Sequence, residues 1–261
     1  MPYHWTRRWL ALSLASALSG CVTLAPNASR SKQDPLESWN RGVYKFNDAL
    51  DRGVAKPLAR GYQKVVPTPV RTGVGNFFAN LATPKVMIND LLQGKLLAAA
   101  NDLGRFVLNT TLGVGGILDP ASQAGLDRND EDFGQTLGHW GVHPGPFLEL
   151  PVFGPSDVRD APSRLLVDSQ MSPLVHHTTN PHHYLQKNTY EKYALKGVEL
   201  VNKRADLLSL DDTLKNIYDP YAFIRDAYLQ RRAYAVADGK IKDELQEEPD
   251  ADADSLPSPA K

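Results

Sequence analysis

Between Gly104 and Gly154 the chain carries ten of its 19 glycines, and this density constrains the fold more than any other feature. Each glycine inside a helix costs about 1 kcal/mol relative to alanine, so no long regular element fits this stretch. The same stretch holds large apolar residues that need burial, which excludes a disordered linker: Phe133, Leu137, Trp140, Phe147, Leu148, Leu150 and Phe153. We therefore expect a compact centre of short helical turns and irregular backbone, with an unusual apolar surface.

The single cysteine, Cys21, ends a segment that is typical of bacterial secretion. Arg7 and Arg8 precede an apolar run over residues 9–18, which is too short to span a bilayer and indicates a signal peptide over residues 1–20. The ending Leu-Ser-Gly-Cys resembles a lipobox, in which the thiol is acylated; the alternative is an ordinary signal peptide with a chance cysteine. Burial of acyl chains, at about 0.8 kcal/mol per methylene, would anchor Cys21 firmly. Val22, in place of an aspartate, favours the outer membrane.

Residues 21–33 then form a lipidated polar tether, and the folded domain follows over residues 34–237. The pattern Asp-Pro-Leu-Glu predicts a helix that Asp34 caps and that ends before Pro57. Thr68-Pro69 and Thr83-Pro84 predict two more helix starts.

The most apolar candidate helix runs from Lys95 to Thr111, yet it contains Asn101, Asp102, Arg105 and Asn109. An isolated membrane span would leave these groups unpaired in hydrocarbon. This helix is therefore either buried in protein or has one face on lipid and the other on a polar lumen.

The remaining pattern is helical as well. Helices are expected from Ser156 or Asp157 to Val167, and over 185–208, 210–218 and 221–236, with a loop over 171–183 and a disordered acidic tail over 238–261. Alternation with a period of two is confined to the short stretch 147–153. We therefore predict an all-α single domain of short and medium amphipathic helices around the glycine-rich centre.

The charge distribution and the motifs exclude several functions. The first 20 residues carry +2 and the last 24 carry −5, so a total of −1 leaves the body at +2, which gives no electrostatic support for nucleic-acid binding. Neither a P-loop lysine nor a nucleophile elbow is present. His139 and His143 are four residues apart, but Gly141 and Pro144 argue against a helix that presents them together. The loop histidines have no accompanying carboxylates and are expected to be solvated: His176, His177, His182 and His183. We expect no catalytic residue, no metal and no cofactor.

Several rigid motifs occur in order between Asp34 and Tyr234, and together they resemble the MlaA/VacJ family of outer-membrane lipoproteins. They include Asp34-Pro-Leu-Glu-x-Trp-Asn-Arg, Tyr44-x-Phe-Asn-x-x-Leu-Asp51, Asn76-Phe with Asn80-Leu, Leu91-Leu-Gln-Gly-Lys95, Arg105-Phe-x-x-Asn-Thr-Thr-Leu-Gly-x-Gly-Gly116, Glu131-Asp-Phe-Gly-Gln-Thr-Leu-Gly-x-Trp-Gly141 and Gly154-Pro-Ser-x-x-Arg-Asp160.

The resemblance implies a helical disc in the periplasmic leaflet, with a central amphipathic channel, beside a trimeric porin. Such a protein would move phospholipids out of the outer leaflet toward a soluble periplasmic lipid-binding carrier and so maintain lipid asymmetry. The alternative is a structural lipoprotein that only scaffolds a porin or envelope complex. A channel needs a polar lumen, whereas a scaffold needs only a dry core. The candidate channel or lipid-contact residues are Arg105, Phe106, Asn109, Thr110, Phe133, Trp140 and Phe147.

Overall fold

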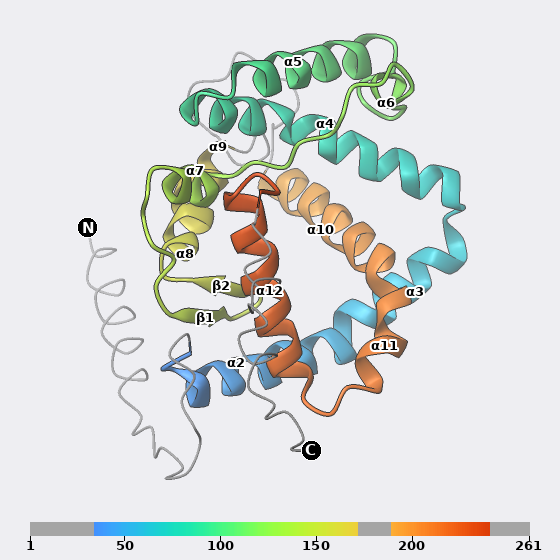
Figure 1. Cartoon of the computed structure of the whole chain (residues 1–261). Helices are drawn as coiled ribbons and strands as arrows, with labels where there is room; N and C mark the ends of the chain where they lie inside the picture. Colours follow the sequence, from blue (N-terminus) through green and yellow to red (C-terminus); the bar gives the residue numbers. More distant parts are fainter. Residues whose placement is uncertain (1–33, 172–188, 241–261) are drawn as a thin grey trace, which may run out of the picture.

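The computed structural model describes residues 34–171 and 189–240, and these are helical apart from one two-stranded sheet. The predicted all-α fold class is therefore confirmed. In Figure 1 the paired helices α4 and α5 form one end of the molecule, α2 and α3 form the opposite end, and α10 and α12 run between them. Cys21 and the histidine-rich loop lie outside the described residues.

The first helical run continues through Pro57, which corrects the predicted stop. It consists of α2 (Glu37–Leu50), a π-helical turn η1 (Asp51–Ala55) and α3 (Lys56–Val65). In the π turn the Lys56 N–H donates to the carbonyl of Asp51, five residues back. This wider turn lies directly before Pro57, so the run absorbs the lost proline hydrogen bond without ending.

The predicted cap at Asp34 is also wrong, because Leu36 occupies the N-cap position of α2 and makes no side-chain cap bond. Asp34 is instead fully buried. It accepts hydrogen bonds from the Asn40 amide at 2.8 Å and from the Tyr221 hydroxyl. Asn40 in turn bonds the strand backbone of Phe147 and Glu149. Asp34 therefore joins the two ends of the described chain to the sheet rather than starting a helix.

Helix α4 (Thr68–Leu92) begins at Thr68-Pro69 as predicted, but it continues through Pro84, so Thr83-Pro84 does not start a new helix. Proline at position 84 removes the helical bond to the carbonyl of Asn80. The Thr83 hydroxyl donates to the neighbouring Ala79 carbonyl at 3.2 Å. Helix α5 (Leu96–Thr111) matches its predicted range and packs antiparallel to α4 (Figure 1).

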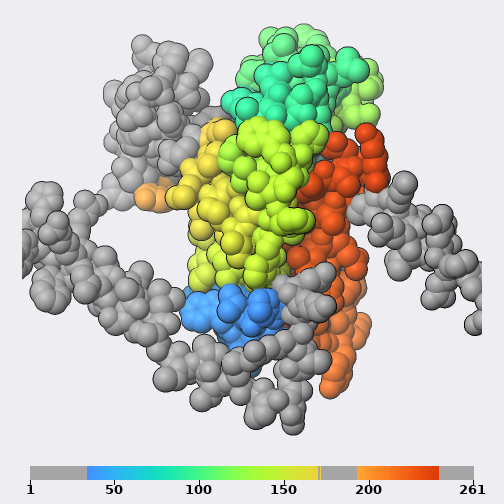
Figure 2. All heavy atoms as spheres, turned by 60° about the vertical axis from the view of Figure 1, so that its left-hand side comes forward, coloured from blue at the N-terminus to red at the C-terminus, as the bar shows by residue number. Residues whose placement is uncertain are grey.

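The glycine-rich centre contains short elements, as predicted. They are α6 (Pro120–Gln123), α7 (Phe133–His139) and an antiparallel hairpin of β1 (Phe147–Leu150) and β2 (Gly154–Asp157), in which Phe147 pairs with Asp157. A helical segment follows from Asp160, later than predicted, because residues 154–157 pair as a strand; it comprises α8 (Asp160–Pro162), η2 (Ser163–Asp168) and α9 (Ser169–Met171). Figure 2 shows the centre filling the space between α2 and α5.

The C-terminal part contains α10 (Thr189–Asp206), η4 (Leu207–Leu210), α11 (Asp211–Lys215) and α12 (Pro220–Val236). Asp219 caps α12 by accepting a bond from the Ala222 N–H. Asp238, placed in the tail by the sequence prediction, lies within the described residues and contacts the Lys95 ammonium.

A cluster of charged side chains, here called the arginine clamp, joins α12 to the centre. Arg232 forms two 2.6 Å bonds to Asp132 and also contacts Asp160. Asp160 additionally binds Arg159 at 2.8 Å and the Tyr228 hydroxyl at 2.9 Å. Burial raises the pKa of Asp160, but the two arginines outweigh it and lower that pKa, so the carboxylate stays charged.

Gly134 on α7 leaves room for the side chains of the arginine clamp. A Cβ at this position would lie 2.4 Å from an Asp160 carboxylate oxygen and 2.5 Å from an Arg232 nitrogen. One turn later, a Cβ on Gly138 would meet Arg159 at 2.7 Å and Val236 at 2.8 Å. The glycines of this helix therefore serve close approach between α7 and the clamp.

The distribution of polar and apolar residues is inverted relative to a water-soluble domain. Within residues 34–171 and 189–240, twenty polar or charged residues are buried against ten apolar ones, five of which are alanine, while 34 large apolar side chains are exposed. Water-soluble domains usually bury more apolar than polar residues, so this distribution is the reverse of the usual one.

Helix α5 shows the inversion most clearly. Its outer face exposes Leu96, Leu97, Leu103 and Val107, whereas Ala99, Asp102, Arg105 and Asn109 are buried. The sequence left open whether this helix has lipid on one face and a polar lumen on the other, and the burial pattern favours that arrangement. No helix in the described part of the chain combines the length and apolarity of a membrane span.

Candidate functional site: a polar pocket beside an apolar groove

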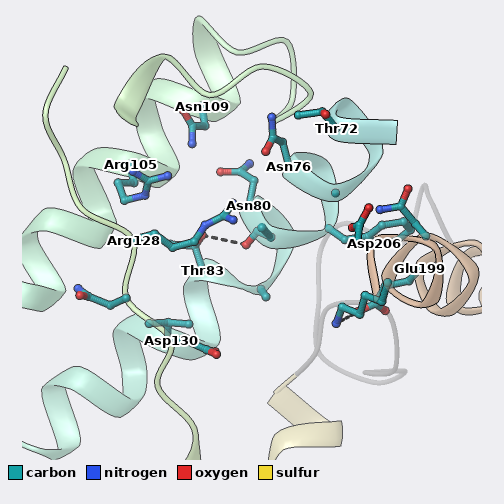
Figure 3. A pocket seen from close by; sticks show the side chains of 18 of the residues that line it. Thr72, Asn76, Asn80, Thr83, Arg105, Asn109, Arg128, Asp130, Glu199 and Asp206 are labelled. Atoms are coloured by element: carbon teal, nitrogen blue, oxygen red, sulfur yellow. Dashed lines mark hydrogen bonds and ion pairs between the residues drawn. The ribbon is translucent and has the colours of Figure 1, made fainter. Parts of the chain in front are cut away.

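A cavity of about 470 Å³ lies between α4, α5, α10 and the segment 128–130. Most of the residues that line this polar pocket are polar or charged, and Figure 3 shows several of these side chains converging on one space. The polar lining residues are Arg71, Thr72, Asn76, Asn80, Thr83, Asp102, Arg105, Asn109, Arg128, Asn129, Asp130, Glu199, Asn202, Lys203 and Asp206.

Arg105 and Asn109, both predicted from the sequence, lie together in the wall, where Asp119 holds them. Arg105 contacts both Asp119 oxygens at 3.0 Å and also bonds Ser122, and the Asn109 amide donates to Asp119 at 3.0 Å. The Asn109 side-chain oxygen Oδ1 accepts from the Ala121 N–H at 3.0 Å. Partial burial raises the pKa of Asp119, but hydrogen bonds from Ser122 and Asn109 and the charge of Arg105 bring it down to about 2.

Other groups in the same wall have no partner within the described residues. Arg71 Nε and Asn80 Oδ1 are both buried without a hydrogen bond. The Asn80 amide nitrogen donates to Thr110 Oγ1 at 3.0 Å, which directs the amide oxygen away from that contact. Arg128 forms no ion pair or hydrogen bond with any described residue, and it reaches toward Asn80 and Thr83 (Figure 3).

Helix α10 supplies the acidic side of the pocket. Glu199 is bound by Lys196 at 2.9 Å and by Lys203 at 2.7 Å. Burial raises the pKa of Glu199, yet the two lysines lower it overall. Asp206, about two turns further along the same face of α10, is exposed and has no ion-pair partner among the residues that the structure describes.

A buried acidic group lies behind the pocket wall. Asp90 is fully buried, and neither of its carboxylate oxygens has a hydrogen-bond donor. Burial and the neighbouring carboxyl groups of Asp102 and Glu131 raise the pKa of Asp90 to about 7. Asp102 itself accepts from Asn129 at 3.2 Å, and Glu131 is bound by Lys95 at 3.0 Å. Asp90 therefore holds a proton at mildly acidic pH, where ordinary aspartates have lost theirs.

A second cavity of about 520 Å³ adjoins the first, and its lining includes Thr72 and Asn76, which also line the polar pocket. Its other walls include Pro69, Leu112, Ile117, Leu118 and Pro120. We call it the apolar groove. The two cavities together place a hydrophilic chamber directly beside a hydrophobic one, which suits an amphipathic ligand.

Gly116 lets the loop between the cavities approach α4. Its φ of 92° is in the left-handed region, and a Cβ there would lie 2.5 Å from Asn80 Cβ. Any other residue would displace Asn80 or the loop, so glycine sets the position of the unpaired amide oxygen.

The other predicted contact residues do not line either cavity. Thr110 bonds Asn80 from outside the wall, and Phe106 is half-buried on α5. Phe133 and Trp140 stack edge to face at 6.4 Å, with Trp140 half exposed. Phe147 is fully buried against Tyr221 and Tyr228, in the hairpin.

Sequence reasoning missed Arg71, Arg128 and Asp206. They come from three segments far apart in the chain, and none belongs to a motif, so no local pattern identifies them. Asn76 and Asn80 did stand in a recognised motif, and their spacing of four on one helix was the available signal.

The structure also bears on metal binding. No group of three or more His, Cys, Asp or Glu side chains is arranged to hold a metal within the described ranges. His139 and His143 are both exposed.

Comparisons with known proteins agree with this architecture. A profile of the MlaA lipoprotein family matches residues 32–235. The intermembrane phospholipid transport system lipoprotein MlaA of Escherichia coli strain K12 is 37% identical over 251 residues, 94% of each chain. The protein of that name from Haemophilus influenzae is 34% identical over 244 residues, 92% of this chain and 94% of its own.

A solved structure described as the structural basis for maintenance of bacterial outer membrane lipid asymmetry is similar to this fold, with a TM-score of 0.66 and 36% identity. The match covers 79% of this chain and 100% of that chain. Family profile, relatives and fold therefore agree, and the chain belongs to the MlaA lipoprotein family.

Proposed function

We propose that this protein is an outer-membrane lipoprotein that moves phospholipids out of the outer leaflet toward a soluble periplasmic carrier, and so maintains lipid asymmetry. The observation that carries the proposal is the polar pocket adjoining the apolar groove through Thr72 and Asn76. A phospholipid has a charged headgroup and hydrocarbon tails, and burial of a charge without partners costs several kcal/mol. The two neighbouring chambers offer each part of the lipid the surroundings it needs.

The inverted exterior supports a position within a leaflet. Exposed leucine and valine side chains on α5 would face acyl chains, and the buried polar groups of the same helix would face the lipid path. We propose that acylated Cys21 and the tether 21–33 hold the domain at the periplasmic leaflet, and that a trimeric porin covers part of its rim.

The hydrophilic lining favours transport over scaffolding. A protein that only scaffolds a porin needs a dry core, whereas Asn76, Asn80 and Thr83 surround open space here. We further propose that transport involves no catalysis, because moving an intact phospholipid forms and breaks no covalent bond.

The test is phospholipid in the outer leaflet of a deletion strain, measured with an enzyme that modifies only surface-exposed lipids. Deletion should raise that lipid, and the wild-type gene should restore the parental level. A deletion strain with parental lipid asymmetry would refute the proposal and favour scaffolding if porin assembly were altered instead.

The proposed anchor has its own test. Cys21→Ser should leave the protein unlipidated and absent from the outer membrane, while Ser19→Thr in the same lipobox should be tolerated. Mass spectrometry of the N-terminus and membrane fractionation measure this. Full lipid clearance by the serine variant would show that the anchor is dispensable.

A further inference from the structure

We infer that the polar pocket selects phospholipids whose headgroup is zwitterionic and carries N–H donors, which is the chemistry of phosphoethanolamine. The inference rests on the proposed function and names the headgroup that the pocket prefers. It is based on two buried atoms without partners and two charges without partners, all lining one cavity.

The buried pair consists of one donor and one acceptor. Arg71 Nε needs an acceptor, and Asn80 Oδ1 needs a donor. Asn80 is 7% exposed, and its orientation is fixed by the bond to Thr110 on one side and by Gly116 on the other. Buried polar atoms without partners are rare in folded proteins. A ligand that completes this wall must therefore supply both an acceptor and a donor.

Two charged groups without partners, one cationic and one anionic, also line the pocket. Arg128 extends from the segment 128–130 toward α4, and Asp206 lies on α10 at the other side (Figure 3). Neither forms an ion pair with another residue of the described chain, in contrast to Arg105 and Glu199 in the same wall. A guanidinium binds phosphate oxygens well, and a carboxylate accepts bonds from an ammonium.

The three common headgroup chemistries differ at this site. A phosphoethanolamine group supplies phosphate acceptors for Arg71 and Arg128 and N–H donors for Asn80 and Asp206. A choline group has the positive charge but no N–H, so Asn80 Oδ1 stays without a partner. A glycerol group has hydroxyl donors but no charge for Asp206. Inorganic phosphate satisfies only the arginines.

The experiment uses the full-length lipoprotein purified in detergent and titrated calorimetrically with short-chain dihexanoyl lipids. Phosphatidylethanolamine should bind at least about tenfold more tightly than phosphatidylcholine or phosphatidylglycerol, in line with about 1.4 kcal/mol per tenfold change. Glycerophosphoethanolamine and inorganic phosphate are titrated separately. If phosphate alone binds as tightly as glycerophosphoethanolamine, the site recognises a free anion and the inference is wrong.

Two variants separate the phosphate contact from the ammonium contact. Arg128→Gln should weaken the binding of all three lipids by similar factors. Asp206→Asn should remove the preference for phosphatidylethanolamine over phosphatidylglycerol, because the glycerol headgroup carries no positive charge for that carboxylate. Arg52→Gln, which removes a surface arginine of η1, is the matched control and should change neither. Equal affinities for the three lipids in the wild type, or a preference over phosphatidylglycerol that survives Asp206→Asn, would overturn the inference.

The outer-leaflet lipid assay keeps this inference separate from the proposed function. Normal clearance of surface phospholipid by a protein without headgroup preference would leave transport intact and contradict only the selectivity. Failure of wild-type protein to affect surface phospholipid would contradict transport itself.

Discussion

Two regions of the molecule use their arginines in opposite ways. In the arginine clamp, Arg232 and Arg159 have their guanidinium groups bound by Asp132, Asp160 or both. In the polar pocket, Arg71 and Arg128 bind no carboxylate of the described chain. Paired buried charges hold elements together, whereas charges left without partners beside a cavity are available to a ligand. From this difference we infer that the clamp is structural, and we propose that the pocket binds the ligand.

The most severe test of the clamp is Arg232→Met. It leaves Asp132 and Asp160 buried without their main counter-charge, so the free energy of unfolding should fall by about 3–5 kcal/mol. Chemical denaturation of the detergent-purified protein measures it. The pocket variant Arg128→Met should change that free energy by less than about 1 kcal/mol. Similar losses in both variants would remove the distinction between the two regions.

Arg105 tests the comparison of clamp and pocket, because it lines the polar pocket but is bound by a carboxylate, as the clamp arginines are. Arg105→Leu leaves Asp119, which is only partly buried, without its counter-charge. We therefore expect the free energy of unfolding to fall by about 2–4 kcal/mol and protein abundance to decrease. Thermal midpoint and abundance are measured together with surface phospholipid. Normal abundance combined with lost transport would mean that Arg105 serves the lipid rather than the fold.

Gly134→Ala tests how tightly the clamp closes. The new methyl group meets Asp160 and Arg232, so the free energy of unfolding should fall by about 1–3 kcal/mol. Gly42→Ala on α2 is the matched control, because no atom lies within 4 Å of its Cβ, and it should stabilise the fold by about 0.5–1 kcal/mol. Equal effects of the two substitutions would show that the clamp is loose.

Asp90→Asn tests the unpaired carboxyl behind the pocket. The folded protein holds the Asp90 proton up to about pH 7, whereas an ordinary aspartate releases it near 3.8. Asp90 therefore stabilises the fold in acid and loses this contribution as the pH rises toward and through 7. The asparagine variant should raise the thermal midpoint at pH 8 by a few degrees and flatten its fall between pH 5 and 8. Asp48→Asn, on the surface of α2, should leave the slope unchanged, and a steeper slope in Asp90→Asn would contradict the assignment.

The smallest effect is expected at the C-terminal tail. Truncation after Lys240 should leave stability and lipid asymmetry unchanged, because the composition beyond it cannot support a packed core. Truncation after Ala237 also removes the contact of Asp238 with Lys95 and should cost less than about 1 kcal/mol, since Lys95 keeps Glu131. Loss of envelope integrity in a strain that expresses the protein truncated after Lys240 would show that the tail binds a partner.

The sequence predicted the helices where local signals decide the outcome. Helix α5 follows from its apolar run over residues 95–111, and α12 begins one residue before the predicted range 221–236. It failed at Pro57 and Pro84, where a π turn or neighbouring groups let the helix continue. These compensations depend on tertiary packing and have no local signature.

The candidate site was predictable only in part. Arg105 and Asn109 do lie in the pocket wall, but the sequence could not reveal that both side chains are already hydrogen-bonded to Asp119. Arg128 and Asp206 meet across one cavity from segments more than seventy positions apart, and only the folded chain brings them together. The presence or absence of a carboxylate partner distinguishes the structural arginines from those that we propose to be functional.

The most direct test of the central claim is to fill the polar pocket. Ala79 and Ala82 on α4 line it, and tryptophan at either position should occupy much of its 470 Å³. Ala100→Trp on the exposed face of α5 is the control. With normal protein abundance, Ala79→Trp or Ala82→Trp should leave surface phospholipid as high as in the deletion strain, while Ala100→Trp restores the parental level. Parental lipid asymmetry in strains whose pocket is filled would contradict the account.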